Sequence, residues 1–162
     1  MNQPLVQLGK IAHVGIVVKD AEQAARFYER VFGIGPWDIN VFDMSGDAKY
    51  FLVDGKPAAP VFKAAFGWSG DVAIEFVEVI SGETAHTRFL QQHGEGMQHL
   101  CFYVDDPDEV MTKLKTEGFE AVLDYEIDTM KDGVPVNVRE IYLNSNQMIG
   151  GTTIQLLRIA TR

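Results

Sequence analysis

The sequence predicts an α+β fold in which two tandem βαβββ modules form an open, cup-shaped, eight-stranded β-barrel. The first observation is an internal repeat: residues 13–20, HVGIVVKD, are similar to residues 99–106, HLCFYVDD. Each copy ends a hydrophobic segment and opens a helical pattern, and each half closes on a similar strand, at 74–77 and 154–157. We expect a single domain over residues 1–162, with modules at about 9–82 and 97–160 and a connector at 83–96.

The first module begins with a strand over residues 10–18, and the helix after it has Asp20 as its N-cap and Gly33 as its terminator. Apolar residues recur at helical spacing in this helix: Ala24, Phe27, Tyr28, Val31 and Phe32. Gly, Pro and Asp residues then separate short β-like segments near 37–43, 48–53, 60–67 and 71–80. These segments make one βαβββ unit and leave room for an added hairpin.

The second module repeats this order after a helical connector over residues 83–92. Its first strand covers residues 97–104, and Asp106 is an N-cap followed by proline at the first helical position. Gly118 ends the helix. Three strands complete the module, near 119–126, 136–143 and 151–159.

Composition limits the function classes. The 162 residues are 46% hydrophobic, which is enough for a buried core, and the formal net charge is −9. This acidity and the lack of a Lys/Arg stripe exclude nucleic acid as an expected partner. No apolar run reaches the ~18 residues that a membrane span requires, and the first residues lack a signal-peptide pattern, so we expect a soluble cytoplasmic protein. The single cysteine, Cys101, excludes an internal disulfide, and we expect it to be buried.

Four polar residues interrupt the apolar strands at equivalent places in the two modules. Because side chains alternate between strand faces, His13, Glu75, His99 and Gln155 each lie opposite the main apolar row of their strand. A lone strand histidine is more often structural than a ligand, but recurrence in a duplicated unit favours a shared site. In a curved cup these side chains converge as ligands of one divalent ion, such as Zn, Co, Ni, Mn or Fe.

With the motifs at 94–99 (GEGMQH) and 150–155 (GGTTIQ), these residues resemble the vicinal oxygen chelate superfamily. That superfamily includes glyoxalase I, methylmalonyl-CoA epimerase, extradiol dioxygenases and bleomycin-binding proteins. The resemblance covers nearly the whole chain, and the connector with the His99 strand looks most like methylmalonyl-CoA epimerase. It implies that the four metal positions fall on the residues named above, that the substrate is a small molecule, and that the protein is a homodimer.

The resemblance also implies an activity: a divalent-metal-dependent isomerase or epimerase that forms a metal-stabilised enolate of an acyl-CoA or another enolisable carbonyl compound. Two departures from the epimerase pattern are present. Gln155 stands where the epimerases carry Glu, and Lys63 stands where they keep a Glu proposed as the catalytic base. The alternatives are a glyoxalase I-like lyase, an Fe(II) extradiol-type dioxygenase with a facial triad, and a non-catalytic small-molecule binding or resistance protein.

Lys63, Glu140 and Asp43 are the predicted catalytic residues, and Tyr50 is a further acid/base candidate. Lys63 lies opposite Phe62, Ala64 and Phe66 by alternation, which predicts that it points into the cup. There a lysine binds a substrate carboxylate, stabilises an enolate oxygen or moves a proton. The alternative is an exposed strand lysine.

Other polar and aromatic residues have two interpretations each. We expect His86 and His93 to be exposed or to cap the connector helix. Two roles are open to the large apolar side chains of Trp37, Trp68, Phe51 and Met97: a wall of the substrate site or packing in the core. The basic side chains of Lys56 and Arg139 either bind an acidic part of the substrate or are solvated at the surface.

Overall fold

The computed structural model describes residues 3–148 and 150–162. The strands are β1 (Ile11–Val17), β2 (Asp38–Asp43), β3 (Ala48–Val53), β4 (Lys56–Pro57), β5 (Val61–Ser69), β6 (Val72–Ser81), β7 (Gly96–Tyr103), β8 (Ala121–Lys131), β9 (Val134–Leu143) and β10 (Thr153–Thr161). The helices are α1 (Ala21–Phe32), α2 (Met44–Asp47), α3 (Ala85–His93) and α4 (Pro107–Leu114), with 3-10 turns η1 (Lys115–Glu117) and η2 (Asn144–Gln147). The strands form a ten-stranded sheet in the order β2-β5-β6-β1-β7-β10-β9-β8-β3-β4.

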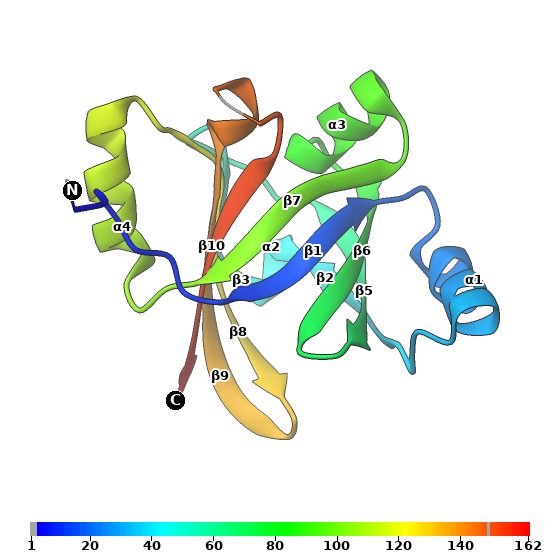
Figure 1. Ribbon diagram of the computed structural model, residues 1–162. Helices are drawn as coiled ribbons and strands as arrows, with labels where there is room; N and C mark the ends of the chain where they lie inside the picture. The colour runs from blue at the N-terminus through cyan, green and yellow to red at the C-terminus, as the bar shows by residue number, and fades with distance from the viewer. Residues whose placement is uncertain (1–2, 149) are drawn as a thin grey trace.

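Two βαβββ units stand side by side in this sheet (Figure 1). The first unit is β1-α1-β2-β5-β6 and the second unit is β7-α4-β8-β9-β10. In each unit the first strand pairs in parallel with the last, and the antiparallel pair of β1 and β7 joins the units. The predicted α+β fold with a curled, open sheet is therefore confirmed.

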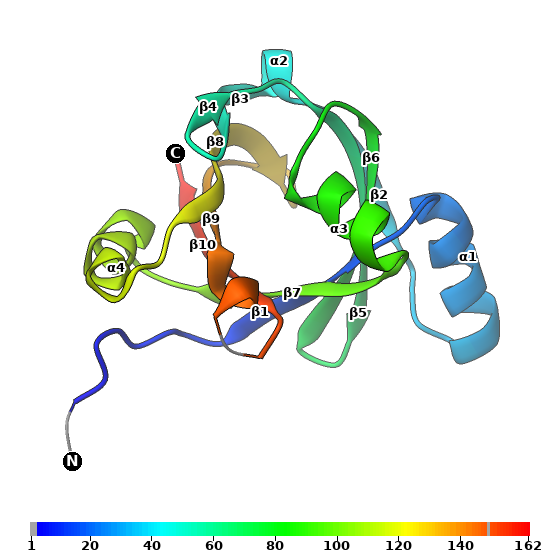
Figure 2. The same ribbon diagram turned by 90° about the horizontal axis from the view of Figure 1, so that it is seen from above.

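The hairpin of β3 and β4 extends the predicted eight strands to ten. Although β3 follows β2 in the chain, it pairs with β8 of the second unit. The short helix α2 makes this crossing: it contacts β2 at one edge of the open sheet and β3 and β8 near the other edge (Figure 2). Sequence order alone does not fix such a pairing, because a strand's partner depends on which free edge and apolar face it meets.

Local signals fix the ends of the two outer helices. Asp20 caps the first turn of α1 through its side chain, and Gly33 ends that helix with a φ of 69°. Asp106 caps α4 in the same way, and Gly118 ends the following turn with a φ of 85°. The predicted helix limits are therefore confirmed in both units.

The sheet curls into a cup, with α1 and α4 outside on opposite sides and α3 over the mouth (Figure 2). Each outer helix buries an apolar cluster against the convex face, with Phe76 under α1 and Leu156 under α4. Another apolar cluster fills the second unit from inside, where Phe51 of β3 packs among residues of β8 and β9. The convex side of the sheet therefore carries the helices, and its concave side faces the inner cluster.

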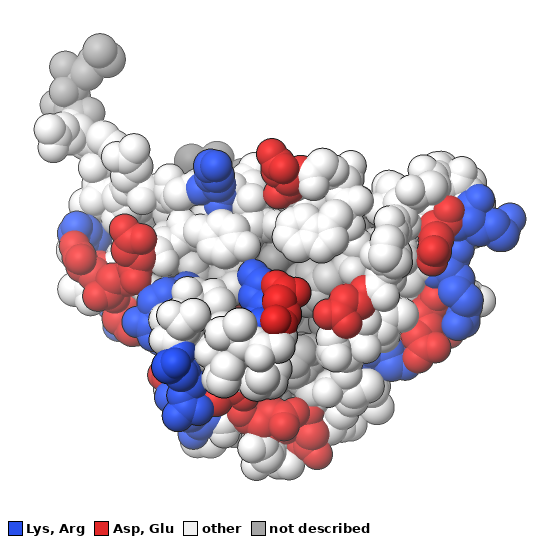
Figure 3. Space-filling model, turned by 90° about the horizontal axis from the view of Figure 1, so that it is seen from below, with Lys and Arg blue, Asp and Glu red and all other residues white. Residues whose placement is uncertain are grey.

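The surface carries charges of both signs. Figure 3 shows a face on which Lys and Arg side chains are interspersed with Asp and Glu and form no continuous basic surface. Within the described ranges, no helix has the length and apolar character needed to cross a membrane.

Candidate metal centre

Four polar side chains meet inside the cup, one each from the adjacent strands β6, β1, β7 and β10. Nε2 of His99 lies 3.1 Å from Oε2 of Glu75 and 3.3 Å from Nε2 of His13. Nε2 of His13 lies 3.3 Å from the same Oε2 atom and 3.0 Å from Oε1 of Gln155. The fold thus brings together the four side chains that the sequence predicts as ligands. Their binding of a metal stays a prediction.

Strand register produces this convergence. β1 and β7 pair so that His99 stands opposite Gly15 and His13 stands opposite Cys101. A Cβ atom at Gly15 would lie 1.9 Å from Cε1 of His99. Only glycine therefore lets the His99 imidazole lie across β1.

The cluster is withdrawn from solvent: the exposed fractions of His13, Glu75 and His99 are 5%, 6% and 0%. Burial alone would raise the pKa of Glu75, but the two imidazoles outweigh burial and hold that pKa well below its usual range. At His13 burial lowers the pKa, and the Glu75 carboxylate outweighs it and raises the pKa. Burial lowers the pKa of His99. Glu75 therefore favours the protonated form of the His13 imidazole.

A divalent cation fits this donor set. Two imidazole nitrogens, one carboxylate oxygen and one amide oxygen suit an ion of intermediate hardness. The atoms offered by His13, Glu75 and His99 all lie within 4.8 Å of one another, close enough to share a single ion.

Gln98 orients the His99 ring. Its Nε2 donates to the carbonyl oxygen of Ala85 at 3.2 Å, so its Oε1 faces two imidazoles. That Oε1 lies 3.0 Å from Nδ1 of His99 and 2.7 Å from Nδ1 of His86. Both Nδ1 atoms therefore act as donors, a tautomer assigned from the network, and Nε2 of His99 keeps its lone pair for a metal.

His86 is buried, so its predicted exposed position is wrong. Helix α3 folds over the cup and brings the His86 ring to 5.8 Å from the His99 ring and 5.3 Å from Tyr142. The sequence marked the connector as helical but gave no sign of the surface that it covers.

Glu140 of β9 holds Gln155 from the side away from the cluster. Nε2 of Gln155 donates to Oε2 of Glu140 at 2.6 Å, and the Tyr125 hydroxyl donates to the same oxygen. Burial raises the pKa of Glu140 to about 7 and outweighs the hydrogen bond from Tyr125. Of the three predicted catalytic residues, Glu140 is the one that lies beside the cluster.

Lys63 points away from the cup, so its predicted inward position is wrong. Its ammonium group donates to Glu22 of α1 at 2.8 Å and lies 3.8 Å from Glu78. The alternation along β5 is as predicted, but the apolar face is the inner one: the ring of Phe66 meets that of His13 at 5.6 Å. Both faces of β5 are covered, and an apolar row therefore does not identify the side under the helix.

Asp43, Tyr50 and Arg139 have other partners. Asp43 is exposed and caps α2. Its carboxylate is therefore engaged away from the cluster, and the structure does not support its predicted catalytic role. Arg139 is buried and pairs with Asp108 and Asp124, each at 2.8 Å, which leaves it unavailable at the surface for a substrate tail. Its guanidinium lies 5.5 Å from the ring centre of Tyr50, and burial raises the pKa of that hydroxyl to about 12.

The aromatic and remaining candidates divide between core and surface. Phe51 stacks on Tyr125 inside the cup, and Trp37 stacks on Phe76 on the α1 side, each with ring centres 4.8 Å apart. Exposed positions are occupied by Trp68, Met97, Lys56 and His93, and Cys101 is buried as predicted.

Sequence reasoning missed Gly15, Gln98 and Tyr125. An isolated glycine in an apolar strand marks a close approach, and Gly15 carried that signal. Gln98 had none, because strict alternation places it on the face opposite His99. The pairing of β1 with β7 shifts register at this point, from Gly15–His99 to Ile16–Met97, and α3 supplies the acceptor for the Gln98 NH₂ group. Tyr125 shares a strand face with Leu123 and Ile127, which indicates the face it occupies but not its hydrogen-bond partner.

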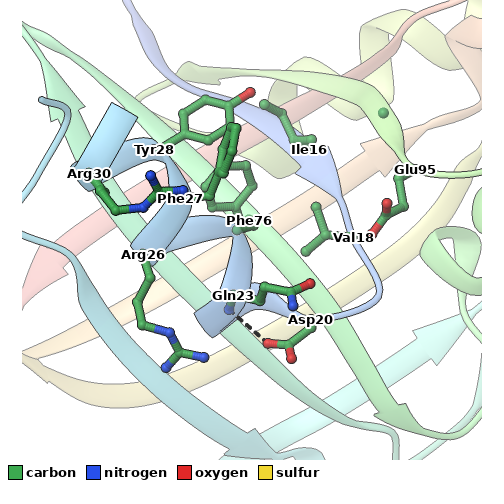
Figure 4. A pocket seen from close by; sticks show the side chains of 12 residues that line it. Ile16, Val18, Asp20, Gln23, Arg26, Phe27, Tyr28, Arg30, Phe76 and Glu95 are labelled. Atoms are coloured by element: carbon green, nitrogen blue, oxygen red, sulfur yellow. Dashed lines mark hydrogen bonds between the residues drawn. The ribbon is translucent and has the colours of Figure 1, made fainter. Parts of the chain in front are cut away.

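A separate hollow of about 820 Å³ lies outside the sheet, beside α1 and the start of β7. Figure 4 shows Phe27 and Tyr28 of α1 close to Ile16, Val18 and Phe76 around it. None of the four cluster residues lines this hollow, so the hollow and the cluster are distinct sites.

Residues 12–137 match the model of the glyoxalase/bleomycin resistance protein/dioxygenase superfamily. The chain is 25% identical to the mitochondrial methylmalonyl-CoA epimerase of Mus musculus, over 96% of this chain and 76% of that protein. It is 26% identical to the Homo sapiens counterpart, over 96% and 81%. The crystal structure of methylmalonyl-CoA epimerase from Mycobacterium tuberculosis is similar in fold, with a TM-score of 0.63, 21% identity and coverage of 97% of this chain and 91% of that chain.

Proposed function

Because the chain belongs to the glyoxalase/bleomycin resistance protein/dioxygenase superfamily, we propose that it is a divalent-metal-dependent isomerase of the epimerase type. Its substrate is an acyl-CoA or another carbonyl compound that loses and regains the proton beside its carbonyl group. Similarity to the methylmalonyl-CoA epimerases of mouse and human supports this substrate class.

The observation that carries the proposal is the buried cluster of His13, Glu75, His99 and Gln155. A buried set of imidazoles around a carboxylate is costly without a cation to share, since each polar group has left water. Residues that serve only the fold do not need to gather from four separate strands.

Each member has a separate task in this proposal. His13 and His99 bind the cation through Nε2, and Glu75 supplies negative charge. When bound, the cation supplies Lewis-acid stabilisation of the charge that develops on a substrate oxygen. Gln98 keeps the His99 ring in its tautomer. Helix α3 keeps water from the His99 side, where electrostatic interactions are stronger in the absence of solvent.

The test combines metal content with proton exchange. The purified protein is analysed for bound metal, and incorporation of deuterium from D₂O beside the carbonyl is followed with methylmalonyl-CoA and a panel of other acyl-CoA and 2-oxo compounds. We expect about one ion per chain and metal-dependent exchange. His13→Ala and His99→Ala are expected to lose most of the ion, whereas His93→Ala, an exposed histidine on α3, retains it. Full exchange by a metal-free protein would contradict the proposal.

An Fe(II)-dependent dioxygenase is the second candidate, because two histidines and one carboxylate also make the facial triad of such enzymes. Oxygen uptake with a catechol by the iron-loaded protein, without proton exchange in the acyl-CoA panel, would favour it. A chain that retains no metal and still binds small molecules would instead be a binding or resistance protein.

A further inference from the structure

We propose that Glu140 is a positioning residue for the metal centre: it orients the Gln155 amide so that the amide oxygen faces the other ligands. The inference rests on the proposed metal centre and adds a residue outside the four ligands. It replaces the acid/base role that the sequence suggested for Glu140.

The hydrogen bonds around Gln155 define one orientation of its amide. Nε2 donates to Oε2 of Glu140 at 2.6 Å, and Oε1 at the other end lies 3.0 Å from Nε2 of His13. An amide donates only through its NH₂ group, so the amide turns that group toward the accepting oxygen of Glu140. Its oxygen then faces the cluster, where a cation requires an oxygen.

Tyr125 fixes Glu140 in turn. Its hydroxyl donates to the oxygen that accepts from Gln155, and the ring is held between Phe51 and Tyr142, at 4.8 and 6.3 Å between ring centres. Tyr125 stands opposite Glu140 in the pairing of β8 with β9. The carboxylate is therefore held by packed side chains and needs no solvent contact to keep its place.

Among the described residues, the register gives this arrangement to the second unit and not to the first. Glu140 pairs with Leu157, two residues after Gln155, and in the first unit the position two residues after Glu75 pairs with Ala64. The methyl side chain of Ala64 can neither donate nor accept a hydrogen bond. Each unit thus contributes one carboxylate, directly through Glu75 in the first and behind an amide in the second.

The second unit thus supplies an uncharged oxygen ligand whose direction is set by a neighbouring side chain. Glu140 stands outside the four ligands and acts on the site through Gln155. Such outer partners orient the ligand and polarise it, and their loss usually weakens metal binding by about 10- to 100-fold.

The test is a double-mutant cycle read as Co²⁺ affinity, by calorimetry on protein stripped of metal. In Glu140→Gln the new amide both donates and accepts, so it no longer forces the Gln155 oxygen inward, and we expect affinity to fall by about 10-fold or more. In a Gln155→Glu background the same change removes repulsion between two carboxylates and adds a donor. There we expect no loss or a gain in affinity, so the two substitutions are strongly non-additive.

Controls separate positioning from folding. Glu126→Gln changes the neighbouring carboxylate on β8, which pairs with Lys49 at the surface, and is expected to leave Co²⁺ affinity unchanged. Thermal unfolding of each metal-free variant reports loss of structure, and rescue of affinity in the double variant excludes simple misfolding. Equal loss from Glu140→Gln in both backgrounds, or no loss with native Gln155, would overturn this inference alone. Failure of the unsubstituted protein to bind divalent metal would overturn the proposed function as well.

Discussion

The two βαβββ units contribute equally to the metal cluster but unequally to its support. Each supplies two ligands, His13 and Glu75 from the first unit and His99 and Gln155 from the second. The second pair is held by hydrogen bonds to Gln98 and Glu140, whereas in the described part of the chain the polar contacts of the first pair's side chains go only to other cluster members. The repeat therefore accounts for the ligands, and differences between the two units account for how the ligands are held.

The outer grooves differ as well. In the second unit, Val6 and Leu8 of the N-terminal segment pack beside α4 against the convex face. The equivalent groove beside α1 keeps the hollow of about 820 Å³, because the chain before β7 comes from α3 and turns away over the cup. Each outer groove is thus bordered by the segment that precedes the first strand of the other unit.

The largest expected effect comes from Gly15→Ala in the first unit. The new Cβ meets the His99 ring, so either the ring or β1 must move, and we expect a loss of bound metal of about 100-fold or more. Elemental analysis of the purified variant measures it. The equivalent position in the second unit is Cys101, opposite His13, and Cys101→Ala is expected to keep the metal. Full metal content in Gly15→Ala would show that the close approach does not matter.

His86→Phe tests the link from α3 to the second unit. Burial lowers the pKa of His86 to about 4, below its usual 6.5. Between these two pH values the His86 imidazole therefore binds a proton in the unfolded chain and is neutral in the folded chain. This contribution to stability is present above pH 6.5 and is lost as pH falls toward 4. Without His86, the pH slope of the unfolding free energy is expected to be shallower by up to about 1.4 kcal/mol per pH unit.

Chemical denaturation of metal-free protein at several pH values between 4 and 6.5 measures that slope. The matched control is His93→Phe, an exposed position on the same helix, which we expect to leave it unchanged. Identical slopes for His86→Phe and the unsubstituted protein would contradict burial of a neutral imidazole.

Tyr125→Phe is expected to have an intermediate effect. It removes one hydrogen bond to Glu140 and keeps the ring stack, so we expect a loss of stability of about 1 kcal/mol and a several-fold loss of Co²⁺ affinity. Calorimetry and thermal unfolding measure the two. In the first unit Asn40 occupies the corresponding pairing position opposite Ala64, and Asn40→Ala is expected to change neither. A similar loss from both substitutions would remove the difference between the units.

Lys63→Met is expected to have the smallest effect. The ion pair with Glu22 lies on the outer face, where such pairs contribute about 0–1 kcal/mol. We expect unchanged metal content and proton exchange, measured as for the native chain. A large loss of exchange with retained metal would restore the catalytic role that the sequence suggested.

Sequence reasoning reached the ligands but not the residues around them. Strand alternation and the repeat placed His13, Glu75, His99 and Gln155 on equivalent faces, and these faces do converge. The same alternation misplaced Lys63, because it separates two faces without saying which is the inner one. Contacts such as His86 with Gln98 join elements whose relative position depends on packing, which no local pattern records.

The sequence by itself determined the two units, the caps at Asp20 and Asp106 and the four inward positions, because these follow from short-range periodicity and from repetition along the chain. The tertiary structure alone decided that β3 joins the second unit, that α3 covers the mouth and that Glu140 stands behind Gln155. These features depend on which side chains meet across the sheet, and that depends on long-range packing among all ten strands.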